Sequence, residues 1–454
     1  MPLSSVSMSL KLAAMALLTA VTHAVPAKGQ NATILPTDDP FYTVPKNLAD
    51  IRPGTILRHR KPPAPIAVFR RDRQNLKDTH QILYRTTDNF GNATATVLTV
   101  MVPFNADYGK VVSQQTAEDS ANRNCAPSYT MQLASEEGGI LGTIEGEVEL
   151  ILMDGFLNEG WIVVMPDYEG PDGLFLASSM AGHAVLDGVR ALLASTNITG
   201  IKNNANVVLN GYSGGAFATA SASELQPSYA PELKIVGASI GGPVPDLFTA
   251  ITSMNKGPFA GLIPVGVQGL AKAYPVISKI MDEQLLPKYK AGFEKAKTQC
   301  SGTALFHNAF TNYFAQVKNQ SIFTTEPVKG ILKANSQGKH VPTMPLFYLQ
   351  SINDELSPIK LTDALLKDYC KGGASVEYTR DFASDHASLS ITGATHVFPW
   401  LKRVLSGEHV AGKCTTRSVF TTLTENPAGL PKEILSALKS LLGKKIGPGH
   451  VVLS

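Results

Sequence analysis

Apolar and polar residues follow each other along this chain in two kinds of stretch, one typical of strands and one typical of helices. Two β-branched runs with a period of two, residues 79–86 and 94–102, flank the turn-rich segment 88–92, which predicts a hairpin. Short apolar runs without alternation come next, and these are typical of strands buried on both faces of a parallel sheet. The predicted strands span residues 110–115, 161–165, 206–210, 234–240, 345–349 and 375–381.

Helical periodicity lies between these strands, which favours an α/β architecture with a mostly parallel central sheet. The predicted helices span residues 182–194, 215–225, 361–369 and 395–405. Over residues 245–340 the periodicity is mostly helical and lacks a convincing buried strand, so we interpret this stretch as a helical insertion. We therefore divide the chain into a first core part, 25–244, the insertion, 245–340, and a second core part, 341–454.

The two ends of the chain carry patterns of their own. Residues 1–24 predict a secretory signal peptide rather than a buried helix, because Lys11 precedes an apolar run and small residues follow it, with cleavage between Ala24 and Ala27. That run is too short to cross a bilayer, and no later stretch reaches about 18 uninterrupted apolar residues. Near the other end, residues 432–445 predict an amphipathic C-terminal helix or flap that packs on the domain in preference to a lipid surface.

Composition narrows the function classes without identifying one. With 44% hydrophobic and 17% charged residues, the 454-residue chain has the make-up of a globular protein. Its 40 basic and 37 acidic residues leave a formal charge of +3, which predicts no nucleic-acid partner. No His or Cys cluster has metal-ligand spacing, so we expect neither a metal site nor a cofactor.

Cysteines and glycosylation sequons agree with an extracellular protein. Four cysteines without a CxxC pair predict two disulfides in an oxidising compartment, and three connectivities are open. They are Cys125, Cys300, Cys370 and Cys414. Four sequons, at Asn31, Asn92, Asn197 and Asn319, predict N-glycosylation.

The segment 211–215 reads Gly-Tyr-Ser-Gly-Gly, a G-x-S-x-G motif. An apolar strand leads into it and a helix of small residues leaves it, which is the context that a nucleophile elbow requires. A glycine-rich phosphate-binding turn is the competing interpretation. The strand and helix favour the elbow, with Ser213 as the nucleophile.

A serine nucleophile needs a histidine base and an acid that orients it. In this type of fold both follow later strands, in the order serine, acid, histidine. His386 comes directly after a predicted strand, whereas His396, His409 and His450 are less well placed. Asp354 follows the strand 345–349, and Glu355 is its rival.

An oxyanion hole requires two hydrogen-bond donors. The backbone amide of Gly214, directly after the serine, is one candidate. The second donor should come from the loop 116–120, whose composition does not single out one residue.

The chain resembles the fungal secretory lipases related to Candida antarctica lipase A. The similar segments are 117–119 (AED), 125–129 (CAPSY), 166–170 (PDYEG), 186–190 (LDGVR), 211–215 (GYSGG) and 257–261 (GPFAG). The resemblance implies an α/β-hydrolase fold with a large helical lid, and a triad of Ser213, Asp354 and His386. It also implies an oxyanion hole at Asp119 and Gly214, and disulfides that pair Cys125 with Cys300 and Cys370 with Cys414.

We therefore expect a secreted serine ester hydrolase of the lipase type, acting on acylglycerols through an acyl-enzyme. The alternative is a short-chain carboxylesterase that deacetylates a secondary metabolite, for example a trichothecene-type toxin. Nothing in the sequence indicates the propeller of a related serine peptidase, and the retained serine, acid and histidine argue against a non-catalytic binding module. The expected partner is a small-molecule or lipid ester, and contact with a lipid interface is left open.

Overall fold

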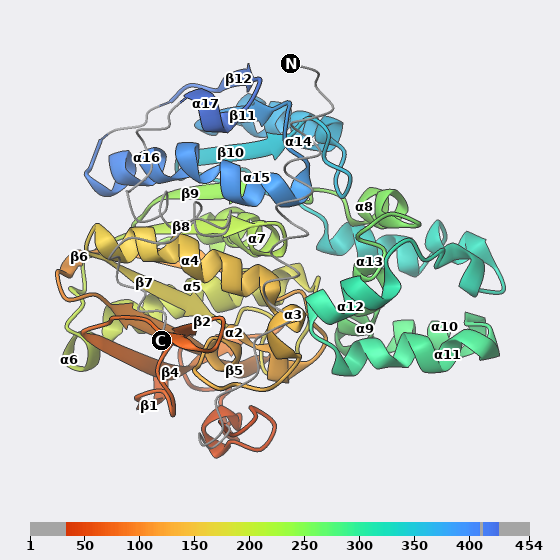
Figure 1. Ribbon diagram of the computed structural model, residues 1–454, viewed down its shortest axis with the longest axis horizontal. Coiled ribbons are helices and arrows are strands. Elements are labelled where there is room, and N and C mark those ends of the chain that lie inside the picture. Colours follow the sequence, from red (N-terminus) through yellow and green to blue (C-terminus); the bar gives the residue numbers. More distant parts are fainter. Residues whose placement is uncertain (1–32, 409–411, 426–454) are drawn as a thin grey trace.

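A ten-stranded sheet forms the centre of the computed structural model, which describes residues 33–408 and 412–425 (Figure 1). Its strand order is β1-β4-β5-β7-β6-β8-β9-β10-β11-β12. The neighbours β1, β4, β5 and β7 pair antiparallel, and every pair from β7 to β12 is parallel. The strands are β1 (Ile56–Arg60), β4 (Asp78–Thr87), β5 (Ala93–Val102), β6 (Asp107–Gln115), β7 (Trp161–Pro166), β8 (Asn206–Tyr212), β9 (Ile235–Gly241), β10 (Leu346–Ser351), β11 (Val376–Asp381) and β12 (Thr415–Val419).

Helices cover both faces of the sheet, so its central strands are buried on both sides as their unbroken apolar runs predict. One face packs against α5 (Ser178–Ala194), α7 (Gly214–Tyr229) and α14 (Ile359–Lys371). The other packs against α4 (Ile144–Asn158) and α16 (Ala394–Leu405). A mostly parallel sheet between two helical layers is the architecture of an α/β-hydrolase fold, which confirms the predicted fold class.

Short elements complete the described part of the chain. The helices and 3-10 turns are η1 (Pro40–Tyr42), η2 (Arg123–Cys125), α2 (Pro127–Thr130), α3 (Gly139–Gly142), α6 (Thr196–Thr199), η3 (Lys295–Thr298), η4 (Phe314–Gln316), η5 (Gln320–Phe323), α15 (His386–Thr392) and α17 (Thr422–Glu425). A separate hairpin pairs β2 (Ala67–Val68) with β3 (Asp72–Arg73).

Residues 242–345 contribute no strand to the sheet and form helices between β9 and β10. These are α8 (Leu247–Met254), α9 (Leu262–Ala273), α10 (Pro275–Gln284), α11 (Pro287–Glu294), α12 (Ser301–Asn308) and α13 (Val328–Asn335). Figure 1 shows them gathered at one side of the sheet. They bury an apolar cluster of their own, which Phe217 of α7 and Leu356 join from the core.

Helix α4 and strand β12 are among the elements that the sequence pattern did not predict, and each has a physical reason. Helix α4 buries Glu147 and Glu149, which are 1% and 7% exposed. In the sequence, these charged residues look like the solvent-facing side of a helix, so the buried face of α4 cannot be recognised from its periodicity. Strand β12 exposes four of its five residues, which leaves it without an apolar run. The predicted helix 182–194 also begins earlier, at Ser178.

The structure joins Cys125 to Cys300 and Cys370 to Cys414, the pairing that the family resemblance implied. Asn92, Asn197 and Asn319 have exposed side chains, and their glycosylation stays a prediction. The signal peptide, Asn31 and the C-terminal helix 432–445 lie outside the described residues. Within the described ranges, none of the helices combines the length and apolar character needed to cross a membrane.

Candidate active site

Ser213 lies in the bend between β8 and α7, with φ 54° and ψ −118°. Its backbone N–H donates to the carbonyl of Gly241 at 2.9 Å, which ties the bend to β9. The bend requires glycine at position 215, because a β-carbon there would lie 1.9 Å from the carbonyl oxygen of Gln115. This strained strand–turn–helix geometry is that of a nucleophile elbow.

His386 is the first residue of α15, a helix that begins with a reciprocal capping box between Asp385 and Ser388. The cap fixes the start of the helix and directs the imidazole toward the elbow. His386 Nε2 lies 2.8 Å from Ser213 Oγ. The ring is 3% exposed, and the ring of Phe259 packs edge-on against it at 5.4 Å between centroids.

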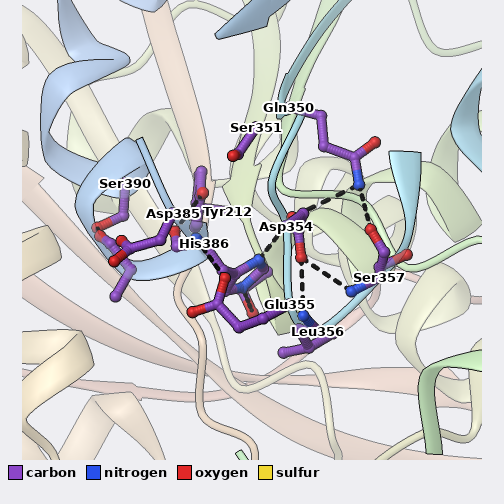
Figure 2. Close-up of polar contacts among 12 residues, drawn as sticks. Tyr212, Gln350, Ser351, Asp354, Glu355, Leu356, Ser357, Asp385, His386 and Ser390 are labelled. Atoms are coloured by element: carbon purple, nitrogen blue, oxygen red, sulfur yellow. Dashed lines mark hydrogen bonds and ion pairs between the residues drawn. The ribbon is translucent and has the colours of Figure 1, made fainter. Parts of the chain in front are cut away.

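Asp354 follows β10 and contacts the other ring nitrogen, with Oδ2 2.9 Å from His386 Nδ1 (Figure 2). Its Oδ1 accepts the backbone N–H groups of Leu356 and Ser357 at 3.0 and 2.8 Å. The carboxylate is therefore held in one orientation, with one oxygen on the loop and one on the imidazole. Serine, histidine and acid form one continuous hydrogen-bonded chain, as the sequence predicts.

The rival acid, Glu355, points elsewhere: its Oε2 accepts the backbone N–H of His386 at 3.0 Å. Of the rival histidines, His396 lies in α16 with its Nδ1 2.6 Å from a guanidinium nitrogen of Arg417. His409 and His450 lie outside the described residues.

The environment of His386 favours a protonated ring more than water does. Burial alone lowers its pKa, but the charge and hydrogen bond of Asp354 outweigh burial and leave the pKa above its usual value. A neutral imidazole with a raised pKa can accept the proton of Ser213 and hold it beside Asp354.

Asp119 lies on the opposite side of the serine, in the loop 116–120 that follows β6. Its backbone is left-handed, with φ 43°, and a β-carbon at Gly214 would lie 1.7 Å from Asp119 Oδ1. Burial raises the pKa of Asp119 to about 8, and the nearby Glu145 adds to this effect. The raised pKa favours the neutral form of this carboxyl group, which can donate a hydrogen bond.

Ser213, Asp119 and Gly214 line one part of a partly open cavity of about 110 Å³. It continues among α8, α9, α10, α11 and α13. Beyond the three residues at its mouth, the side chains that line it are apolar except for Gln284 and Tyr313. A cavity of this kind fits a long hydrocarbon chain better than a polar group.

Other polar residues support the loops that carry Asp354 and His386, and little in the sequence points to them. Tyr212 donates its hydroxyl to the carbonyl of His386 at 2.6 Å. Ser351 donates to the carbonyl of Ser384 at 2.5 Å, and Gln350 Nε2 donates to the carbonyl of Ser357 at 2.7 Å. Of these residues, only Tyr212 could have been singled out from the sequence, because it lies inside the G-x-S-x-G motif.

Among the described residues, one group of metal-ligating side chains lies close enough together to hold an ion, namely Cys125, Glu137 and Cys300. Its two sulfur atoms are bonded to each other, so the group offers no thiolate ligand.

The chain is similar to known lipases over most of its length. Residues 135–412 match the secretory lipase family. "Lipase A" of Arthroderma benhamiae is 45% identical over 424 residues, which cover 92% of this chain and 90% of that protein. "Secreted triacylglycerol lipase LIP4" of Malassezia globosa is 34% identical, with 98% of each chain covered.

Among solved structures, Candida antarctica lipase A superposes with a TM-score of 0.79 at 30% identity, covering 92% of this chain and 99% of that one. The chain therefore belongs to the secretory lipase family and is a carboxylic ester hydrolase.

Proposed function

We propose that the protein is a secreted serine lipase that cleaves long-chain acylglycerol esters, with Ser213, His386 and Asp354 as its catalytic triad. The observation that carries the substrate class is the apolar cavity that begins at Ser213 and runs among the helices of the insertion. An acyl chain in this cavity places its ester carbonyl beside the serine hydroxyl. In this proposal residues 245–340 are a lid that forms the acyl site.

The reaction follows from the contacts. Ser213 Oγ attacks the ester carbonyl while His386 Nε2, 2.8 Å away, accepts the serine proton. Asp354 stabilises the imidazolium through its contact with Nδ1. The proton then passes to the leaving alcohol, and a water molecule hydrolyses the acyl-enzyme by the same steps.

Two donors stabilise the oxyanion in this mechanism. The backbone N–H of Gly214 points from the start of α7, where helix N–H groups have no partner in their own helix. The backbone amide at Asp119, on the loop 116–120, supplies the second donor. The raised pKa of the Asp119 carboxyl group favours its neutral form, which places no negative charge beside the oxyanion.

Hydrolysis of p-nitrophenyl acetate, p-nitrophenyl palmitate and emulsified triacylglycerol tests both the substrate and the nucleophile. We expect palmitate and triacylglycerol to be cleaved, and Ser213→Ala to lower kcat at least about 10⁴-fold. The matched control is Ser221→Ala, a buried α7 serine whose hydroxyl donates to the carbonyl of Phe217. It should keep kcat within about twofold.

Two outcomes would change the proposal. Activity that survives in Ser213→Ala would remove the assigned nucleophile. A steep preference for acetate, with no turnover of emulsified triacylglycerol, would favour the short-chain esterase instead.

Secretion belongs to the same proposal, since residues 1–24 have the pattern of a signal peptide and the Malassezia globosa relative is named a secreted lipase. Mass spectrometry of protein from the culture medium should find an N-terminus between residues 25 and 28, and glycans on the exposed sequon asparagines. Retention of residues 1–24 on the extracellular protein would contradict it.

A further inference from the structure

We propose that Glu149 and Glu169 are positioning residues that hold the loop 116–120, and with it Asp119, against the nucleophile elbow. Neither residue touches the cavity, and neither has a part in the mechanism above. The inference rests on the proposed function, because it assigns these residues to the oxyanion side of that site.

Glu149 ties the start of the loop to the sheet. It projects from α4 and is 7% exposed. Its Oε1 accepts the backbone N–H of Ala117 at 3.1 Å, and its Oε2 accepts Gln114 Nε2 at 2.9 Å. Gln114 in turn accepts the side-chain amide of Asn210 at 2.6 Å. One carboxyl group thus links the loop to β6, and through Asn210 to β8, the strand that leads into Ser213.

Glu169 holds the other end of the same loop. It follows β7 and is 2% exposed. Its two carboxyl oxygens lie 3.2 and 3.4 Å from the backbone nitrogen of Ser120, which donates to them. Asp119 therefore lies between two backbone N–H groups that buried carboxyl groups hold in place.

The loop needs such support because its own conformation is unfavourable. A non-glycine residue with φ 43°, as at Asp119, costs free energy that the surrounding contacts must offset. The fit to the elbow also leaves little freedom, since the carbonyl of Gln115 and Oδ1 of Asp119 occupy the places where residues 215 and 214 would carry β-carbons. A displacement of about 1 Å at a catalytic group can lower a rate about 100-fold.

Burial of these carboxyl groups is costly in itself. It raises the pKa of Glu149 to about 8, although the hydrogen bonds from Ala117 and Gln114 oppose the rise. The pKa of Glu169 also lies well above its usual value, first because of burial and then because of electrostatic repulsion from Asp119 whenever that group is ionised. Two such groups, on the N–H donors of Ala117 and Ser120 at either side of the strained residue Asp119, support a positioning role.

Steady-state kinetics of Glu149→Ala and Glu149→Gln test the proposal on the full chain. Alanine removes both acceptors, whereas glutamine retains one carbonyl oxygen for Ala117. We expect kcat to fall about 100-fold for alanine and about tenfold for glutamine, with KM within about threefold in both. Glu169→Gln should lower kcat in the same way.

Glu147→Gln is the matched control. Glu147 lies two residues away on α4, is also buried, and accepts the backbone N–H of Phe69 at 2.7 Å while it pairs with Arg70, away from the loop. We expect this variant to lose thermal stability about as much as Glu149→Gln while its kcat stays within about twofold.

An unchanged kcat in folded Glu149→Ala, or equal losses of kcat in Glu147→Gln and Glu149→Gln, would overturn the positioning role. If the alanine variant does not fold, the comparison of the two glutamine variants decides. Failure of the proposed function is a separate result, because it appears as activity that survives in Ser213→Ala.

Discussion

Asp354 and Glu355 are neighbours in the sequence, yet they contact different parts of His386. Asp354 lies against the imidazole, while Glu355 accepts the backbone N–H at the start of α15. A carboxylate at the first turn of a helix stabilises that helix, whereas one against the ring changes its basicity. Replacement of each acid by its amide should therefore affect kcat differently.

Asp354→Asn should lower kcat by about 10³–10⁴-fold, because the amide keeps the shape of the side chain but loses the charge that stabilises the imidazolium. Without that charge the pKa of His386 should fall, so the acidic limb of the kcat/KM profile should move to lower pH. Glu355→Gln retains an acceptor for the His386 N–H and should keep kcat within about fivefold. Equal losses in both variants would remove the assignment of the acid.

The elbow is the element on which the site depends, and its glycines are set by contact with β6 and the loop that follows. At position 215 a side chain would meet the backbone of Gln115, which belongs to a central strand and has no room to withdraw. At position 292, in α11, a β-carbon would meet no atom within 4 Å. Replacement of glycine by alanine should therefore lower the stability of the protein at position 215 in α7 but not at position 292 in α11.

Gly215→Ala should lower the free energy of unfolding by about 1–3 kcal/mol, because the backbone of β6 must shift to relieve the overlap. Gly292→Ala should be neutral or stabilise by up to about 1 kcal/mol, since alanine favours the helix. Urea unfolding of both variants measures the difference. Equal stability of Gly215→Ala and the wild type would contradict the packing of the elbow on β6.

Across the whole molecule, buried carboxyl groups couple folding to pH. Burial raises the pKa of Asp119 and Glu149 to about 8, and that of Glu147 and Asp167 to about 7. In the unfolded chain such groups release their protons near pH 4 to 4.5. The folded protein therefore binds more protons than the unfolded chain between about pH 4.5 and pH 8.

The contribution of these carboxyl groups to folding stability is fully present below their pKa in the unfolded chain, and it is lost as pH rises through their pKa values in the folded protein. We therefore expect the Tm to fall by at least about 5 °C between about pH 5 and pH 8.5. Differential scanning calorimetry at fixed ionic strength measures how steeply the Tm falls with pH. The Glu147→Gln variant should show a shallower fall. A Tm that rises over this range would contradict the raised pKa values.

The sequence could predict the serine, acid and histidine because each follows a strand of one parallel sheet. The carboxyl ends of such strands meet at a common edge, so chain order brings Ser213, Asp354 and His386 together. It could not predict Glu149 and Glu169, because a buried carboxyl group and a solvated one look alike in a sequence. Nor could the composition of the loop 116–120 single out Asp119, since the residue types do not show which residue adopts the left-handed backbone conformation beside the serine.

The pattern of apolar residues by itself determined the α/β architecture and the helical insertion, since burial on both faces of a sheet requires unbroken apolar strands. Together with the G-x-S-x-G motif it also predicted the chain order of the proposed catalytic groups. Only the tertiary structure decided which acid meets the imidazole, which loop residue faces Gly214, and that the insertion lines an apolar cavity. Those features depend on approaches of a few ångströms between segments distant in the chain. Such approaches follow from the packing of the folded molecule, which local periodicity does not encode.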